Sequence, residues 1–183
     1  MIRRYCSLFA ILLLLLPVAC SRDKIQLRKA LSVLERLQIV VPDDMLMIQD
    51  GLLKPYRIPD NLPLMIVYIG PEECSDCRIS HITEYMPLFE WGEESGLFRM
   101  MIVFSPASEQ MERIQNRLMS RKIEIPVYLD YYSEFHNKNA IPDDPRVHCF
   151  LLNEDRHPIF AGNPLASEPL NELFKTALDA ARL

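Results

Sequence analysis

The segment 64–69 restricts the fold of this chain more than any other segment, because all of its residues are apolar. It reads Leu-Met-Ile-Val-Tyr-Ile and lies between Pro63 and the turn signal Gly70-Pro71. A strand of this composition is buried on both faces, whereas a strand at the surface alternates apolar and polar residues. Other elements must therefore cover this strand from both sides, which predicts a mixed α/β domain.

Strand and helix patterns alternate after this segment, in the order β-α-β-α-β, an irregular loop, and β-β-α. The further strand patterns are apolar runs, at residues 98–104, 125–129, 147–152 and 158–161. The helix patterns carry apolar residues at three- and four-residue spacing, over residues 79–92, 105–118 and 167–181. The loop after residue 129 is predicted to be irregular because it is polar and rich in Asn and Pro.

Residues 20–61 are predicted to form a tether and an N-terminal extension ahead of this domain. Residues 25–37 have the apolar spacing of a helix. Residues 39–41 and 45–48 read as two short strands joined at Pro42-Asp43-Asp44, with Asp50-Gly51 as the next turn signal. The domain itself is predicted to occupy residues 62–183.

Residues 1–19 read as a secretion signal that is removed from the mature protein. Arg3 and Arg4 precede an apolar run over residues 8–16, which is shorter than the ~20 residues of a membrane-spanning helix. The sequence Pro17-Val18-Ala19-Cys20 resembles the lipobox of bacterial lipoproteins, which implies that Cys20 carries acyl chains such as palmitate and anchors the protein in a membrane. The alternative is an ordinary signal peptide followed by a chance cysteine.

The same resemblance and the charge balance bear on location and partners. Arg22, rather than Asp, at the second position after Cys20 implies the outer membrane of the bacterial cell envelope, with the domain facing the periplasm. Removal of residues 1–19 leaves 18 Lys and Arg against 25 Asp and Glu, a net charge of −7. An acidic domain without a basic stripe is not expected to bind nucleic acid. The sequence also has neither a G-x-S-x-G motif nor a phosphate-binding loop, so it gives no support to hydrolase or nucleotide chemistry.

The motif Cys74-Ser75-Asp76-Cys77 carries the candidate chemistry. It lies between the buried strand and the following amphipathic helix, so Cys74 is predicted at a helix N-terminus, where backbone N–H groups stabilise a thiolate. Cys77 follows one turn later. This spacing suits one thiol that attacks a disulfide and a second thiol that resolves the product.

The order of strand, C-x-x-C, helix and β-α-β-β-α is similar to the thioredoxin superfamily, and in particular to membrane-anchored thiol-disulfide oxidoreductases of diderm bacteria. The resemblance covers residues 62–183 and implies a three-layer α/β/α sandwich. It implies that Cys74 attacks and Cys77 resolves, that the clients are proteins with disulfides or thiols, and that another protein supplies or accepts the electrons. No small cofactor is implied.

Other positions are carried over from the same resemblance. His148 begins the strand that follows the family's cis-proline, and Val147 stands where that proline is expected. Tyr68 occupies the place of a buried acid, and Glu73 occupies the place of a tryptophan. Gly162-Asn163-Pro164, after the hairpin, resembles an element of the lipoprotein group.

The charges around Cys74 indicate how strongly oxidising the Cys74–Cys77 pair is. Glu72, Glu73 and Asp76 oppose a thiolate, while Arg78 and His81 favour it. This balance argues against a strongly oxidising site and predicts a reductase-like or isomerase-like poise, or a structural disulfide.

Other interpretations of the motif remain open from the residues alone. The pair could form a disulfide that never exchanges, in a non-catalytic lipoprotein that serves as an interaction or structural module of the envelope. A metal site would borrow His81, His148 or Cys149, but the sequence has no second C-x-x-C at ligand spacing. Cys149 lies in an apolar strand and is predicted as a small core residue.

Overall fold

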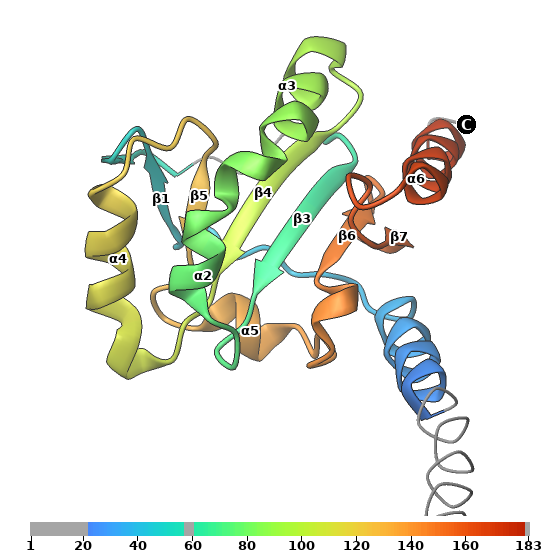
Figure 1. Ribbon diagram of the computed structural model, residues 1–183, viewed down its shortest axis with the longest axis horizontal. Helices are drawn as coiled ribbons and strands as arrows, with labels where there is room; N and C mark the ends of the chain where they lie inside the picture. The colour runs from blue at the N-terminus through green and yellow to red at the C-terminus, as the bar shows by residue number, and fades with distance from the viewer. Residues whose placement is uncertain (1–21, 57–60, 182–183) are drawn as a thin grey trace, which may run out of the picture.

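The computed structural model describes residues 22–56 and 61–181, so the predicted signal sequence and Cys20 lie outside the described residues. One mixed sheet runs through the domain, and helices pack against both of its faces (Figure 1). Within residues 22–56 and 61–181, no helix has the length and apolar character needed to cross a membrane.

The sheet has seven strands in the order β2-β1-β5-β4-β3-β6-β7. Their bounds are β1 Leu46–Gln49, β2 Leu52–Lys54, β3 Leu64–Ile69, β4 Arg99–Phe104, β5 Val127–Leu129, β6 Cys149–Leu152 and β7 Pro158–Ala161. Strands β3, β4 and β5 run parallel, whereas β6 and β1 run antiparallel to their neighbours β3 and β5. Strand β3 is therefore an interior strand, between β4 and β6, and all of its residues are buried, as its composition predicts.

The helices form two layers. One layer contains α2 (Ser75–Ser80), the 3-10 segment η1 (Ile82–Tyr85), α3 (Met86–Ser95), α4 (Met111–Met119) and α6 (Glu168–Ala180). The other layer contains α5 (Glu134–Lys138) and a helix over residues 22–34. Two further 3-10 segments are η2 (Ser108–Gln110) and η3 (Pro145–Val147).

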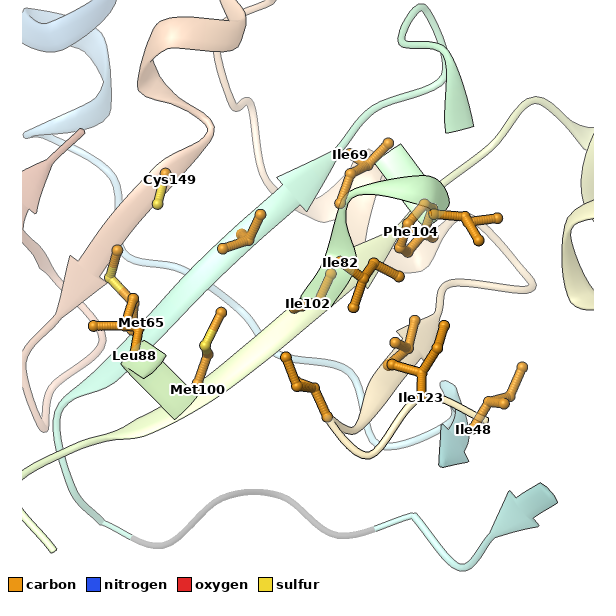
Figure 2. Close-up of a cluster of buried hydrophobic side chains, with 14 of the residues drawn as sticks. Ile48, Met65, Ile69, Ile82, Leu88, Met100, Ile102, Phe104, Ile123 and Cys149 are labelled. Carbon is orange, nitrogen blue, oxygen red and sulfur yellow. The ribbon is translucent and has the colours of Figure 1, made fainter. Parts of the chain in front are cut away.

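Strand β3 joins the two layers because its side chains alternate between the faces of the sheet. Met65, Val67 and Ile69 belong to the cluster under α2, α3, α4 and α6, part of which Figure 2 shows. Ile66 and Tyr68 belong to the cluster on the other face. The predicted α/β/α sandwich and its element order after residue 62 are confirmed.

The helix predicted over residues 79–92 begins earlier and is interrupted. Helix α2 begins at Ser75, and η1 separates it from α3. Pro87, at the second position of α3, lacks a backbone N–H and crowds the preceding turn. The interruption therefore lies where the chain cannot continue regular α-helical hydrogen bonding.

The N-terminal extension forms a hairpin at a different place from the one predicted. In the described chain Ile39 lies in no strand, and its N–H donates to the carbonyl of Arg156 at 2.9 Å. The hairpin joins β1 to β2 through Asp50 and Gly51, whose φ angles are 55° and 74°. Two successive residues with positive φ match the twist of paired strands, so this dipeptide forms the turn and Pro42-Asp43-Asp44 does not.

Helix α5 lies in the stretch predicted to be irregular. The buried Asp130 caps it, because its carboxylate accepts hydrogen bonds from the N–H groups of Phe135 and His136, both at 3.0 Å. The Ser105 hydroxyl donates to the same carboxylate at 2.8 Å. Phe135 is the one apolar residue of the helix. The sequence therefore has no apolar periodicity from which helix α5 could be predicted.

Phe174 is expected to contribute strongly to stability because α6 packs through it. Its ring is fully buried and makes edge contacts with Trp91, Phe98 and Phe160 at centroid distances of 5.6, 5.3 and 5.5 Å. We expect Phe174→Ala to lower the free energy of unfolding by about 4 kcal/mol. The adjacent Leu173 is mostly exposed, so Leu173→Ala is the matched control, with a loss below about 0.5 kcal/mol. Equal losses in urea denaturation would contradict this packing of α6.

Candidate functional site

Cys74 and Cys77 form a disulfide at the carboxyl end of β3, with 5.3 Å between their Cα atoms. Cys74 is the N-cap residue of α2, and its Sγ accepts a hydrogen bond from the Cys77 N–H at 3.3 Å. Both cysteines are exposed. Either sulfur is therefore open to an incoming thiolate, which a disulfide buried in a core would not be.

The carboxylate of Glu73, the residue before the motif, is nearly buried and accepts four hydrogen bonds. The donors are the Gly70 N–H at 3.2 Å, Arg78 Nε at 3.1 Å, Arg78 Nη2 at 2.7 Å and His148 Nδ1 at 2.6 Å. Burial raises the pKa of the Glu73 carboxyl, but the hydrogen bonds from His148, Arg78 and Gly70 outweigh burial, and the pKa lies below its ordinary value. Glu73 is thus an anion at the base of the site.

His148 is bound on both sides of its ring. Nδ1 faces Glu73, and Nε2 faces the carbonyl oxygen of Pro142 at 2.7 Å. A carboxylate and a carbonyl oxygen can only accept, so both ring nitrogens face acceptors, an arrangement that suits an N–H on each. Arg78, Glu73 and His148 therefore form a hydrogen-bonded triad, which ties the loop before Cys74 to the segment that leads into β6.

Val147 lies in the core beneath this triad. It is fully buried, it ends η3, and its N–H donates to the carbonyl of Asp144 at 3.0 Å. The described residues contain no cis peptide bond. The place where the sequence resemblance predicts a cis-proline is thus a 3-10 turn in this protein. It is followed by the His148 carbonyl, which accepts from the Tyr68 N–H at 2.7 Å.

Asp76, inside the motif, is paired with cations from another helix. Arg113 of α4 donates to the Asp76 carboxylate, and Arg117 Nε lies 4.0 Å from it. Together with the triad, these contacts offset the charges of Glu73 and Asp76. The acids beside Cys74 therefore oppose a thiolate less than their number in the sequence suggests.

Two candidates from the sequence, His81 and Cys149, lie apart from the disulfide or inside the core. His81 is exposed and pairs with Glu84 at 2.6 Å. Cys149 is a buried free thiol whose pKa is raised to about 12 by burial, against a smaller opposing effect of Arg78. It therefore stays protonated at neutral pH, in agreement with its prediction as a core residue. Within residues 22–56 and 61–181, no three His, Cys, Asp or Glu side chains are grouped so that they could hold a metal ion.

Sequence reasoning missed the cations from α4 and the full role of His148. Arg113 and Arg117 are about 40 positions from Asp76, and only the packing of α4 against α2 brings them together. The available signal was their four-residue spacing, which places both on one face of a helix. The predicted element Gly162-Asn163-Pro164 does lie near the site, since Gly162 and Asn163 line a cavity of about 250 Å³ with Arg78 and His148.

Comparison with known proteins gives distant likenesses in fold. No protein-family model and no curated protein matches the chain. The solution structure of an uncharacterized thioredoxin-like protein from Porphyromonas gingivalis is 16% identical, with a TM-score of 0.46 over 78% of this chain and 92% of that chain. The solution structure of a candidate protein disulfide isomerase from Bacteroides thetaiotaomicron is 13% identical, with a TM-score of 0.42 over 80% and 88%. The assignment of the sandwich rests on the strand order and on the position of the disulfide.

Replacement of Glu73 by glutamine is expected to destabilise the protein, because it leaves the buried His148 and Arg78 without their anion. We expect Glu73→Gln to lower the free energy of unfolding at pH 7 by about 3 kcal/mol. The folded pKa of Glu73 is lowered, so its contribution is present at neutral pH and is lost as the pH falls below about 4. The difference between wild type and variant in urea unfolding should therefore shrink at acidic pH.

The matched control for this measurement is Glu72→Gln. Glu72 is exposed, and the described structure gives it no hydrogen bond or ion pair. We expect this change to alter stability by less than about 0.5 kcal/mol at either pH. If the Glu73→Gln and Glu72→Gln proteins had the same free energy of unfolding at pH 7, the triad would contribute nothing to stability.

Proposed function

We propose that this protein is a lipid-anchored, extracytoplasmic thiol-disulfide oxidoreductase that acts on protein disulfides through Cys74 and Cys77. The observation that carries the proposal is the exposed disulfide at C-x-x-C spacing between β3 and α2. The α/β/α sandwich presents this pair at the end of the interior strand β3, which places it on a rigid scaffold.

Thiol-disulfide exchange between this protein and a client protein needs no cofactor. In the reduced protein the Cys74 thiolate attacks one sulfur of a client disulfide, and the other client sulfur leaves as a thiolate. Cys77, once deprotonated, attacks the Cys74 sulfur of the mixed disulfide and releases the second client thiolate. The client gains two electrons and the pair Cys74–Cys77 is oxidised to the disulfide. A dithiol protein donor then restores the reduced pair by the same steps in reverse.

The surroundings favour Cys74 as the attacking residue. Its Sγ accepts the Cys77 N–H, and a hydrogen bond to sulfur stabilises the thiolate more than the thiol. Arg113 and Arg117 offset Asp76, while Arg78 and His148 offset Glu73. Cys149, with its raised pKa, does not compete at neutral pH.

Trapping of mixed disulfides tests the catalytic proposal. We expect Cys77→Ala to accumulate Cys74-linked client proteins in the native envelope, visible as bands that disappear on reduction, because the resolving thiol is missing. Cys74→Ala should trap few or none, and Cys77→Ala combined with Cys149→Ala should trap as well as Cys77→Ala.

A failure to trap, together with absent disulfide reductase activity of the purified wild type, would overturn the oxidoreductase in favour of a non-catalytic interaction module. The reduction potential gives an independent measure, because a structural disulfide lies below about −300 mV and an exchanging one lies above it.

Acylation of Cys20 tests the anchor. The proposal rests on the lipobox-like sequence Pro17-Val18-Ala19-Cys20 that follows an apolar run. We expect the full-length protein to incorporate labelled palmitate and to remain in the membrane fraction, because several acyl chains contribute about 0.8 kcal/mol per buried CH₂. Cys20→Ala should abolish the label, with Cys6→Ala as the control. Label retained in Cys20→Ala would refute the anchor at this residue.

A further inference from the structure

A cavity of about 260 Å³ opens beside the redox motif, on the side of the triad that faces α5. Its walls come from the loop before Cys74, from α5, and from the segment that leads to η3. Glu73, the residue next to Cys74, lines it. When a client cysteine is joined to Cys74, the client residues one or two positions from that cysteine therefore lie near the opening. Successive Cα atoms are about 3.8 Å apart.

The charge of this cavity is negative. Glu72 and Asp143 line it and are exposed, and the described structure gives neither of them a hydrogen bond or an ion pair. The carboxylate of Glu73 is engaged by Arg78 and by His148, which also lines the cavity. An approaching side chain therefore meets a negative electrostatic potential from the two carboxylates at the opening.

The inner wall is aromatic and apolar. The Tyr68 hydroxyl is hydrogen-bonded to His136 Nδ1 at 2.7 Å, and the two rings lie nearly parallel with centroids 6.5 Å apart. Tyr68 is only 3% exposed, and its ring packs against Phe135, His136 and His148. The accessible apolar lining therefore comes from Pro71, Ile141 and Pro145. An aliphatic stem that ends in a cation fits such a wall, because long charged side chains pack their methylene groups on apolar surface and keep the charged end in water.

We propose that this cavity binds one cationic side chain, Lys or Arg, that lies next to the reactive cysteine of a client protein. The inference rests on the proposed oxidoreductase function and adds its substrate preference. The volume suits a single long side chain rather than a cofactor, since small-molecule sites are usually 300–1,000 Å³. The carboxylates Glu72 and Asp143 recognise the charge, and Pro71 and Ile141 pack against the stem.

The test uses three peptides that differ at one position. Each carries a disulfide and has Lys, Gln or Glu beside the attacked cysteine, and the reduced full-length protein in detergent reduces each of them at low ionic strength. We expect kcat/KM to follow the order Lys, Gln, Glu, with Lys about fivefold above Glu, because two exposed carboxylates each contribute modestly. The difference should appear mainly in KM and should shrink at high salt.

Variants assign the preference to the cavity. The double variant Glu72→Gln and Asp143→Asn should bring the Lys and Glu peptides to within about twofold of each other. Glu154→Gln is the control, because Glu154 lies in the turn at the opposite end of β6, and it should keep the wild-type preference.

The outcomes separate the two proposals. Failure of the wild type to reduce any peptide would refute the oxidoreductase. Reduction of all three at equal rates, or a Lys preference that survives the double variant, would refute the cavity and leave the oxidoreductase standing.

Discussion

Burial of β3 on both faces is the constraint on which the rest of the structure depends. A strand with apolar side chains on both sides is stable only when two layers cover it, and each fully buried aliphatic side chain contributes about 2 kcal/mol. Helices α2, α3, α4 and α6 supply one layer, and α5 with the helix over residues 22–34 supplies the other. Because the strand is fully enclosed, its chain reaches the surface only at its ends, and Cys74 and Cys77 lie at the carboxyl end.

The Glu73 carboxylate connects that scaffold to the segment that carries Cys74 and Cys77. A nearly buried anion is tolerated only when hydrogen bonds and opposite charges replace water. Gly70 and Arg78 supply donors from the same segment, and His148 supplies one from the start of β6. The compensation of one carboxylate therefore holds together the loop before Cys74 and the segment that leads into β6.

Much of the fold and the centre of the site could be predicted from the sequence, because they depend on local patterns. The apolar runs identify β3, β4 and β6, the turn signal Asp50-Gly51 identifies the N-terminal hairpin, and the C-x-x-C spacing identifies the disulfide pair. Local patterns failed where residues from elsewhere in the chain decide the structure. Helix α5 depends on the buried cap Asp130, and the N–H of Ile39 pairs with the distant carbonyl of Arg156 and not with a neighbouring strand.

The sequence by itself determined a strand buried on both faces, an α/β order and a dithiol motif at a strand-to-helix junction, since apolar periodicity and covalent spacing are properties of neighbouring residues. Only the tertiary structure decided the electrostatics of the site. Electrostatic interactions depend on distance in space and on exclusion of water, so the contact of Glu73 with His148, the pairing of Asp76 with Arg113 and the acidic cavity of Glu72 and Asp143 arise only when β6, α4 and α5 pack around β3.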